Sequence, residues 1–292
     1  MTHTLTQQTV LDTRDALPAF PQVVLQILNT LDDPDASLSL LTRQVETDAV
    51  IAARVLSLCN RAATQGPGRG PVDDVFTALQ LVGMARVREV AMTIQLGDFL
   101  KDFVPGKNMA GFWSHSLACA VCGLELAHYT QAEVGADTSL ITCLLHDVGQ
   151  LWLLRFAPDG LQAAKEMAVR DDVEIDVAER AVFGVDHGTV GAWLAAAWGL
   201  SAGICKGIQH HHQPEPGLPE PLVAVAHVSE VLSHALNLSP LRHNRVRGIS
   251  AAACARLDLD WGEDSQSLFG RIDARSRHAF APYPQSDDDT MG

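Results

Sequence analysis

The chain has 292 residues, of which 47% are hydrophobic and 19% are charged. Such a composition excludes disorder of the whole chain and predicts a globular protein that buries a substantial core. The sequence carries 21 Lys and Arg against 35 Asp and Glu, a formal net charge of -14. This charge argues against a general affinity for nucleic-acid phosphates or for an anionic membrane surface, so we expect a protein or small-molecule partner.

The cysteines and the apolar runs indicate the compartment. The six cysteines lie mostly within apolar stretches, and the N-terminal sequence MTHTLTQQTVLDTRDA has neither the basic start nor the apolar stretch of a signal peptide. Charged residues or His interrupt every apolar run before the roughly 18–20 residues that a membrane helix needs. We therefore expect a reduced, cytoplasmic protein that contacts neither membrane nor nucleic acid.

Ala, Leu and Val dominate the sequence, and alternating strand patterns are scarce, so the sequence predicts an all-α fold. The first part of the chain favours helices at residues 17–31, 38–46, 49–60 and 72–103, with a Gly- and Pro-rich loop at 64–71 and a break at Gly83. Longer helices are expected at residues 112–129, 138–156, 159–170, 174–183, 187–198, 201–212 and 221–236.

The pattern also predicts how the chain is organised. Residues 1–16 form an N-terminal extension, and residues 17–238 are expected to form one compact unit with a first helical part at 17–108 and a second at 109–238. Residues 239–292 lose helical periodicity, carry Arg242, Arg245 and Arg247 close together, and end in a segment of disordered composition.

A His-Asp pair stands out in the middle of the chain. His146 and Asp147 adjoin within the expected helix 138–156, whose other residues are apolar nearly all round. Burying an imidazole and a carboxylate there costs several kcal/mol in order of magnitude unless a partner compensates them. A divalent metal is one such partner, with further ligands from distant helices; a hydrogen-bonded network without metal is the other. The candidate additional ligands are His115, His187, His211, His212 and His227.

Two smaller signals have structural interpretations. Cys119-x-x-Cys122 has no second pair at zinc-binding spacing, so these cysteines are expected to pack in the core. The run His210-His211-His212 ends an expected helix, where the negative end of the helix dipole favours protonated imidazole even without a metal.

Ordered motifs across about 220 residues resemble the HDOD domain, a branch of the HD superfamily related to the HD-GYP cyclic-di-GMP phosphodiesterases. The first half matches in Leu17-Pro-x-x-Pro21, Asp33-Pro34-x-x-Ser37, Asp48-x-x-x-Ala52-Ala-Arg54-Val-Leu56 and Ala78-Leu-x-Leu81-x-Gly83. The second half matches in Phe112-Trp113-x-His115-Ser116, Leu144-Leu-His146-Asp147-Val-Gly149, Phe183-Gly184-x-Asp186-His187, Trp198-Gly-Leu200, Ile208-x-x-His211-His212-x-Pro214 and His227-Val-x-Glu230. The resemblance implies an HD-superfamily helical bundle with an additional N-terminal helical subdomain.

The resemblance also implies a ligand set. The HD-type metal pattern falls on His115, His146, Asp147, His187, His211 and His212, and the closing position falls on His227 or on the pair His227 and Glu230. These residues imply one or two divalent ions of iron, manganese, zinc or nickel. The GYP triplet is absent, because Gln213-Pro-Glu-Pro-Gly-Leu-Pro219 follows the paired His. Gly111 occupies the place of an acidic residue four before His115, so no third metal is expected.

The resemblance favours a bacterial signal-transduction module that binds a signalling protein or a small regulatory ligand without catalytic turnover. The alternative is a metal-dependent phosphohydrolase or phosphodiesterase of the HD superfamily. No residue is assigned a catalytic role at this stage.

Overall fold

The computed structural model describes residues 4–29, 38–46, 49–63, 72–104, 109–214, 219–238, 248–262 and 265–280. In these ranges the regular elements are all helices, so the predicted all-α fold is confirmed. In chain order they are α1 (Gln7–Leu11), a 3-10 turn (Arg14–Ala16), α2 (Gln22–Asn29), α3 (Leu38–Glu46), α4 (Ala49–Ala63), α5 (Val75–Val82), α6 (Met84–Phe103), α7 (Ala110–Tyr129), α8 (Ala136–Leu145), α9 (Val148–Phe156), α10 (Pro158–Arg170), α11 (Ile175–Phe183), α12 (His187–Ala197), α13 (Ala202–His210), α14 (Pro221–Ala235), α15 (Ala251–Arg256) and α16 (Ser265–Phe280).

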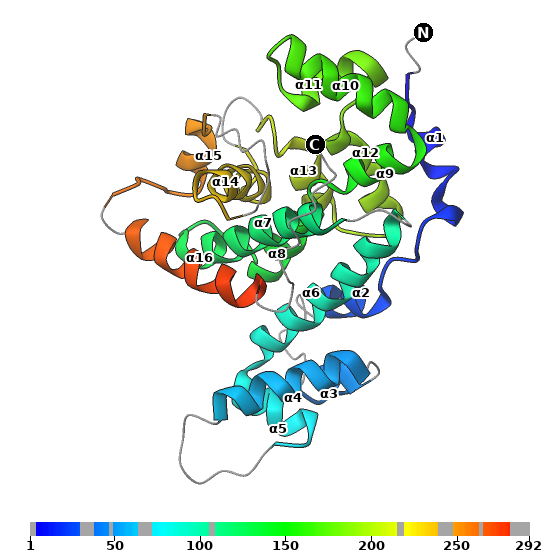
Figure 1. Ribbon diagram of the computed structural model, residues 1–292. Coiled ribbons are helices and arrows are strands. Elements are labelled where there is room, and N and C mark those ends of the chain that lie inside the picture. The colour runs from blue at the N-terminus through cyan, green and yellow to red at the C-terminus, as the bar shows by residue number, and fades with distance from the viewer. Residues whose placement is uncertain are drawn as a thin grey trace. The chain divides into compact units, whose positions relative to one another are not determined.

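The chain divides into two compact units (Figure 1). The smaller unit is Ala19–Phe99, and the larger unit combines Met1–Pro18 with Leu100–Gly292. In the smaller unit α5 packs on α3 and α4. Its buried side chains include Val24, Leu41, Val45, Ile51, Val55, Leu79 and Met92.

Turn chemistry explains two boundaries in the smaller unit. α2 begins at Gln22, later than predicted, because a proline at position 21 disfavours helical backbone at the residue before it. Gly83, with φ of 90°, separates α5 from α6 at the predicted break, in a conformation that side chains with a Cβ rarely adopt. The expected loop at 64–71 and the predicted end of the first helix at residue 31 lie outside the described residues.

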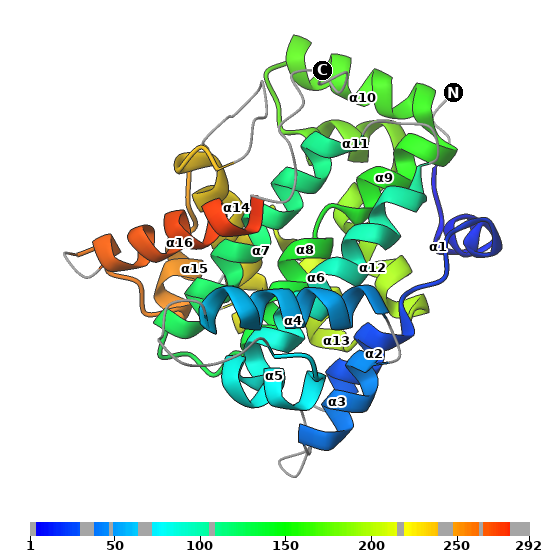
Figure 2. The ribbon, with the colours of Figure 1, turned by 60° about the horizontal axis from the view of Figure 1, so that its bottom comes forward.

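The larger unit is built around α7, which is buried along most of its length. α7 packs against α8 and α14, and a second group forms where α12 packs against α9 and α13 (Figure 2). α13 also contacts α8 and α14, so the two groups share one core. This arrangement brings the ends of helices that are distant in sequence into one region.

Both chain extensions belong to the larger unit. α1 packs on α12, and the indole Nε1–H of Trp152 donates to Thr13 Oγ1 (2.8 Å). The expectation that periodicity ends after residue 238 is wrong, because α15 packs on α14 and α16 packs on α7. Two arginines of α16, Arg271 and Arg275, pair with the buried carboxylate of Glu125 at 2.9 and 2.8 Å. The three clustered arginines at 242–247 and the final residues 281–292 lie outside the described residues.

Among the described residues, no single helix has both the length and the hydropathy that crossing a membrane requires. One bent pair, Ala136–Phe156 followed by Pro158–Arg170, passes by length and composition only.

Candidate metal centre

The His-Asp pair lies at a break between two helices, not inside one helix as its apolar surroundings predicted. His146 is the residue at the C-terminal end of α8, and Asp147 precedes the first residue of α9. The Asp147 side chain makes no capping hydrogen bond to α9. Its carboxylate faces the imidazoles of other helices instead, so the break presents both side chains to the same interior region.

Close backbone packing holds the next turn in place. A Cβ atom at Gly149 would lie 1.9 Å from the carbonyl oxygen of His187 and 2.8 Å from the backbone nitrogen of Gly191. Only glycine therefore lets α9 approach α12 this closely. The contact sets the position of Asp147 relative to His187.

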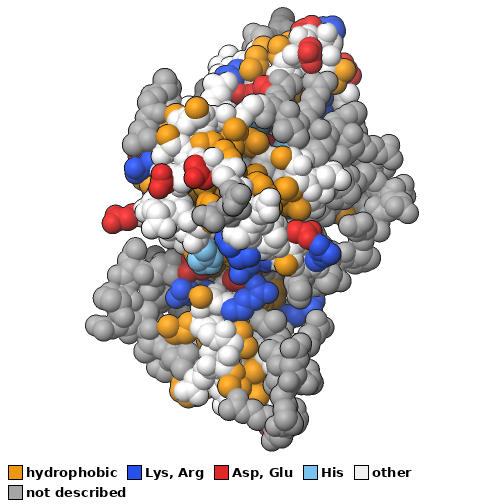
Figure 3. All heavy atoms as spheres, turned by 90° about the vertical axis from the view of Figure 1, so that its left-hand side faces the viewer, with side chains coloured by type: hydrophobic (Ala, Val, Ile, Leu, Met, Phe, Trp, Pro, Cys, Tyr) orange, Lys and Arg blue, Asp and Glu red, His pale blue; other side chains and the backbone are white. Residues whose placement is uncertain are grey.

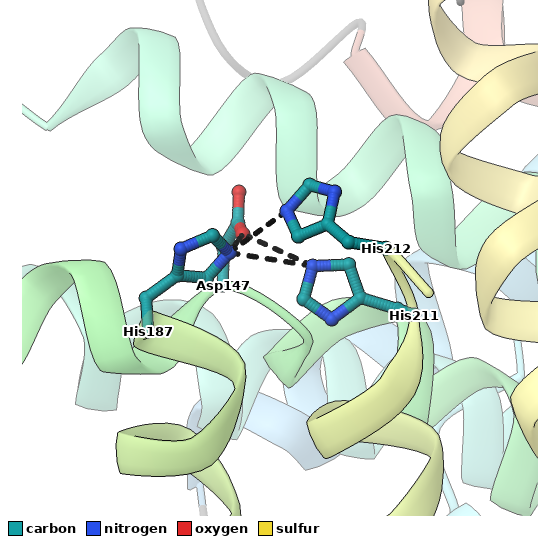
Figure 4. Close-up of side chains that lie close together, drawn as sticks. All are labelled: Asp147, His187, His211 and His212. Atoms are coloured by element: carbon teal, nitrogen blue, oxygen red, sulfur yellow. Dashed lines mark hydrogen bonds and ion pairs between the residues drawn. The ribbon is translucent and has the colours of Figure 1, made fainter. Parts of the chain in front are cut away.

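One group of side chains surrounds Asp147 Oδ1, and we call it site A: His187, His211, His212 and Asp147 (Figure 4). Asp147 Oδ1 lies 3.2 Å from His187 Nε2 and 3.7 Å from His211 Nε2. His187 Nε2 lies 3.0 Å from His212 Nε2 and 3.4 Å from His211 Nε2. Asp147 precedes α9, His187 is the first residue of α12, and His211 and His212 follow α13.

A second group surrounds the other oxygen of the same carboxylate, and we call it site B: His115, His146, Glu230 and Asp147 Oδ2. Asp147 Oδ2 lies 3.4 Å from His146 Nε2 and 3.7 Å from His115 Nε2. His146 Nε2 lies 3.3 Å from His115 Nε2 and 3.1 Å from Glu230 Oε2. Asp147 thus connects the two sites, one carboxylate oxygen toward each.

Hydrogen bonds to the outer ring nitrogens decide which atoms face inward. The Nδ1–H of His146 donates to the carbonyl oxygen of Cys143 (2.7 Å), and that of His211 donates to the carbonyl oxygen of Ile208 (2.7 Å). His187 Nδ1 is 2.6 Å from the carboxylate of Glu179. Because these oxygens can only accept, each Nδ1 carries the hydrogen, and in the neutral ring each Nε2 keeps a free lone pair. Facing lone pairs need a cation between them, either a proton or a metal ion.

Comparison with known proteins identifies the family. A family model for the HDOD domain matches residues 17–214. The chain belongs to the HDOD domain family. A curated protein of Treponema pallidum (strain Nichols), itself uncharacterized, is 24% identical over 211 residues, which cover 72% of this chain and 40% of that protein. This HDOD chain therefore spans less than half the length of that relative.

Solved structures share the fold at low sequence identity. An HDOD domain protein of unknown function from Geobacter sulfurreducens superposes with a TM-score of 0.73 at 23% identity, covering 94% of this chain and 98% of that one. A proposed signal transduction protein from Marinobacter aquaeolei VT8 gives 0.70 at 22% identity, over 94% and 60% of the two chains. A proposed phosphohydrolase from Shewanella amazonensis SB2B gives 0.67 at 22% identity, over 92% and 94%. At these identities the likeness concerns the fold alone.

The HDOD structure brings most of the residues predicted as ligands together. His115, His146, Asp147, His187, His211, His212 and Glu230 all contribute donor atoms to sites A and B. His227 does not: its Nδ1–H donates to the carbonyl oxygen of His211 (2.8 Å), and its Nε2 accepts from the backbone N–H of Ser250 (3.0 Å). With both ring nitrogens engaged, His227 supports the backbone beside the cluster, and of the two alternatives at the closing position only Glu230 faces site B.

Three residues near the cluster escaped the sequence reasoning. Glu179 Oε2 accepts from both the backbone N–H and Nδ1–H of His187. The imidazole of His234 stacks on that of His115 and lies 3.6 Å from Glu230 Oε1. Cys119 Sγ lies 3.7 Å from His115 Nε2. The available signal was helical spacing, since Cys119 follows His115 and His234 follows Glu230 by four residues.

Mutual attraction controls protonation in the cluster. Burial alone would lower the pKa of His146 and of His187. Instead, Asp147 raises the pKa of His146 well above the ordinary 6.5, and Glu179 does the same for His187. Burial lowers the pKa of His211 and of His212, and neighbouring imidazoles add to this effect. Burial alone would raise the pKa of Asp147, which His146 holds well below its usual range. The cluster therefore contains ionised carboxylates that require nearby positive charge.

Most side chains of the cluster are buried, whereas those of His212 and Glu230 are partly exposed. His146, His187 and His211 each expose 1% or less of their surface. On the face of the molecule in Figure 3, His side chains occupy only a small part of the visible surface. Water screens such buried charges poorly, so their interactions are stronger than those of exposed ion pairs.

The donor set fits divalent metal ions. Imidazole nitrogen and carboxylate oxygen are the usual ligands of zinc, manganese and iron. Two donor atoms that each lie about 2.0–2.3 Å from one ion are roughly 3–4 Å apart at common coordination angles. The four donor–donor distances given above for site A run from 3.0 to 3.7 Å, and the four given for site B run from 3.1 to 3.7 Å. The His/Asp cluster could therefore hold a metal.

Proposed function

We propose that this HDOD protein is a signal-transduction module whose cluster binds one or two divalent ions, and that it acts by binding a protein partner or small regulatory ligand without turnover. The observation that carries the metal-binding half is the set of inward Nε2 atoms of His146, His187 and His211, each fixed by a hydrogen bond at Nδ1. Ions of iron, manganese, zinc or nickel match these donors.

Burial of most of the cluster supports a role without turnover. A phosphoryl substrate has to reach the ions, yet the imidazoles of His146, His187 and His211 are buried, and His212 and Glu230 are only partly exposed. Bound ions would instead join α7, α9, α12, α13 and α14, because each of these helices or its end carries a ligand. In this proposal the ions stabilise the larger unit, and the surface of the domain contacts the partner.

The first experiment measures metal and stability together. Purified protein is analysed for bound metal, then melted before and after chelation, beside the double variant His146→Ala/Asp147→Ala. We expect metal in wild type, a lower melting temperature after chelation, and little metal in the variant. Absence of metal from wild type after reconstitution with each candidate ion would favour the hydrogen-bonded network without metal and overturn this half of the proposal.

The second experiment tests turnover. Metal-reconstituted protein is assayed against cyclic dinucleotides, nucleotides and simple phosphomonoesters. We expect no steady hydrolysis. Turnover that His146→Ala abolishes would overturn the non-catalytic half of the proposal.

One observation favours the second candidate, a metal-dependent phosphohydrolase. Asp147 directs Oδ1 toward site A and Oδ2 toward site B. A carboxylate between two metal positions is the arrangement with which two-metal sites activate water and stabilise a phosphoryl group. The residues suited to such chemistry are the ligands themselves, and steady turnover in the second experiment would select this candidate.

A further inference from the structure

The thiol of Cys119 lies beside site B. His115 and Cys119 are four residues apart on α7, so both side chains lie on the same face of that helix. Cys119 exposes 1% of its surface, and its Sγ atom is 3.7 Å from His115 Nε2. The sequence interpretation assigned this cysteine to core packing, and apolar residues do adjoin it. Its sulfur nevertheless approaches two of the imidazoles that face the cluster.

The donor atoms fit a single ion. Sγ of Cys119 and one ring nitrogen each from His115 and His146 all lie within 4.8 Å of one another. A metal–sulfur bond of about 2.3 Å and a metal–nitrogen bond of about 2.0–2.1 Å place sulfur and nitrogen roughly 3.6 Å apart at a tetrahedral angle. The observed separation of 3.7 Å between Cys119 Sγ and His115 Nε2 matches this geometry.

We propose that Cys119 is a thiolate ligand of the ion in site B, together with His115 and His146. This inference rests on the metal binding proposed above and adds a soft donor that distinguishes the two sites. When the ion binds, the S–H bond breaks, the proton passes to solvent, and the sulfur electron pair forms the bond to the metal without any change of oxidation state. Carboxylate oxygens of Glu230 and Asp147 lie 3.1 and 3.4 Å from His146 Nε2, on the side of that imidazole that faces site B.

The metal preference of the two sites follows from this assignment. Site A offers three imidazoles and one carboxylate oxygen, whereas site B adds a sulfur. Thiolate favours zinc, cobalt(II) and iron over magnesium or manganese, which prefer oxygen ligands. We therefore infer that site B selects the softer ions.

Cys119 also has a partner that does not require a metal. Its S–H donates to Ser233 Oγ (3.3 Å), and the Ser233 hydroxyl donates to the carbonyl oxygen of Glu230 (2.8 Å). A purely structural thiol would keep this hydrogen bond when metal is added. The experiment must therefore detect the sulfur–metal bond itself.

Cobalt(II) absorption gives that readout. Metal-free protein is titrated with cobalt(II), and bound cobalt is measured in parallel. We expect a thiolate-to-cobalt charge-transfer band in the near ultraviolet for wild type and for the control Cys122→Ser, and loss of this band in Cys119→Ser. Cys122 is a suitable control because it is fully buried in the apolar core on the same helix.

The outcomes separate the two proposals. Two outcomes overturn the ligand assignment and leave metal binding intact. In the first, wild type binds cobalt but shows no charge-transfer band; in the second, the band persists in Cys119→Ser. No bound cobalt overturns both. If Cys119→Ser fails to fold, X-ray absorption of the cobalt-loaded wild type decides: a sulfur neighbour at about 2.3 Å supports the assignment, and a shell of nitrogen and oxygen alone overturns it.

Discussion

Glu179 forms two hydrogen bonds with His187. Its Oε2 atom accepts from the backbone N–H of His187 (2.8 Å) and from the Nδ1–H of the same residue (2.6 Å). Both side chains are fully buried. The carboxylate fixes the ring so that Nε2 points at Asp147 and at the other two imidazoles of site A, those of His211 and His212. Carboxylates that hold a metal-binding imidazole in this way commonly control both its orientation and its basicity.

Replacing Glu179 with glutamine keeps the side-chain size and removes the negative charge. We predict that Glu179→Gln lowers metal affinity by about 10–100-fold. Calorimetric titration with zinc measures the change. Glu166→Gln on α10 is the matched control, because Glu166 accepts a hydrogen bond from Gln162 at the exposed surface, away from the cluster. Equal affinity in both variants would contradict a positioning role for Glu179.

Glycine at position 149 permits the approach of α9 to α12. We predict that Gly149→Ala lowers the free energy of unfolding by about 1–3 kcal/mol or more, since the added methyl collides with the backbone of His187. The control is Gly270→Ala on α16, where a Cβ meets no atom within 4 Å, and helix propensity predicts a gain of about 0.5–1 kcal/mol. Urea unfolding measures both; similar effects of the two substitutions would refute the close-contact explanation.

The buried carboxylate of Glu125 is neutralised by two arginines of α16. Removing both partners in Arg271→Ala/Arg275→Ala leaves Glu125, which is 3% exposed, without these two cations. We predict a loss of about 1–3 kcal/mol in unfolding free energy and faster hydrogen exchange in α16. Arg277→Ala is the control, since Arg277 pairs with Asp273 at the exposed surface of the same helix. Unchanged exchange in the double variant would show that apolar contacts alone hold α16.

Asp186 caps the N-terminus of α12, and its carboxylate makes the stability of the folded protein depend on pH. Burial alone would raise its pKa, but the backbone N–H of Thr189, with His187 and Arg180, lowers the pKa below the ordinary 3.8. A lowered folded-state pKa contributes stability above the unfolded value, and this contribution is lost as the pH falls through the folded value. We predict that the melting temperature of the wild type exceeds that of Asp186→Asn near neutral pH. The difference between the two melting temperatures should shrink as the pH falls into the acid range. A constant difference across this range would contradict the assignment, because Asn retains the capping hydrogen bond.

Helical spacing and the resemblance predicted much of the molecule. The break at Gly83 and helices α3, α10 and α11 lie close to their expected bounds, because local residues decide them. The ligands also came from separate stretches whose convergence no local pattern encodes; only the HDOD resemblance linked His115 to residues as distant as Glu230.

The remaining differences arise from contacts between distant segments. The helix break at His146 and Asp147 was missed because the flanking residues are apolar on every side, as in a continuous buried helix. The C-terminal helix α16 was missed because its buried face is short: among the side chains described in it, the fully buried apolar ones are Leu268 and Ile272. Its arginines pair with Glu125, a residue of α7 that sequence spacing cannot relate to Arg271 or Arg275.

The distribution of ligands along the chain has a consequence for biosynthesis. His115 is synthesised before Glu230, so α14 has to leave the ribosome before the side chains of site B can come together. A nascent chain therefore exposes half of the cluster to the cell while the other half is still being translated. In the metal-bound form proposed above, acquisition of an ion at site B would therefore follow the synthesis of α14.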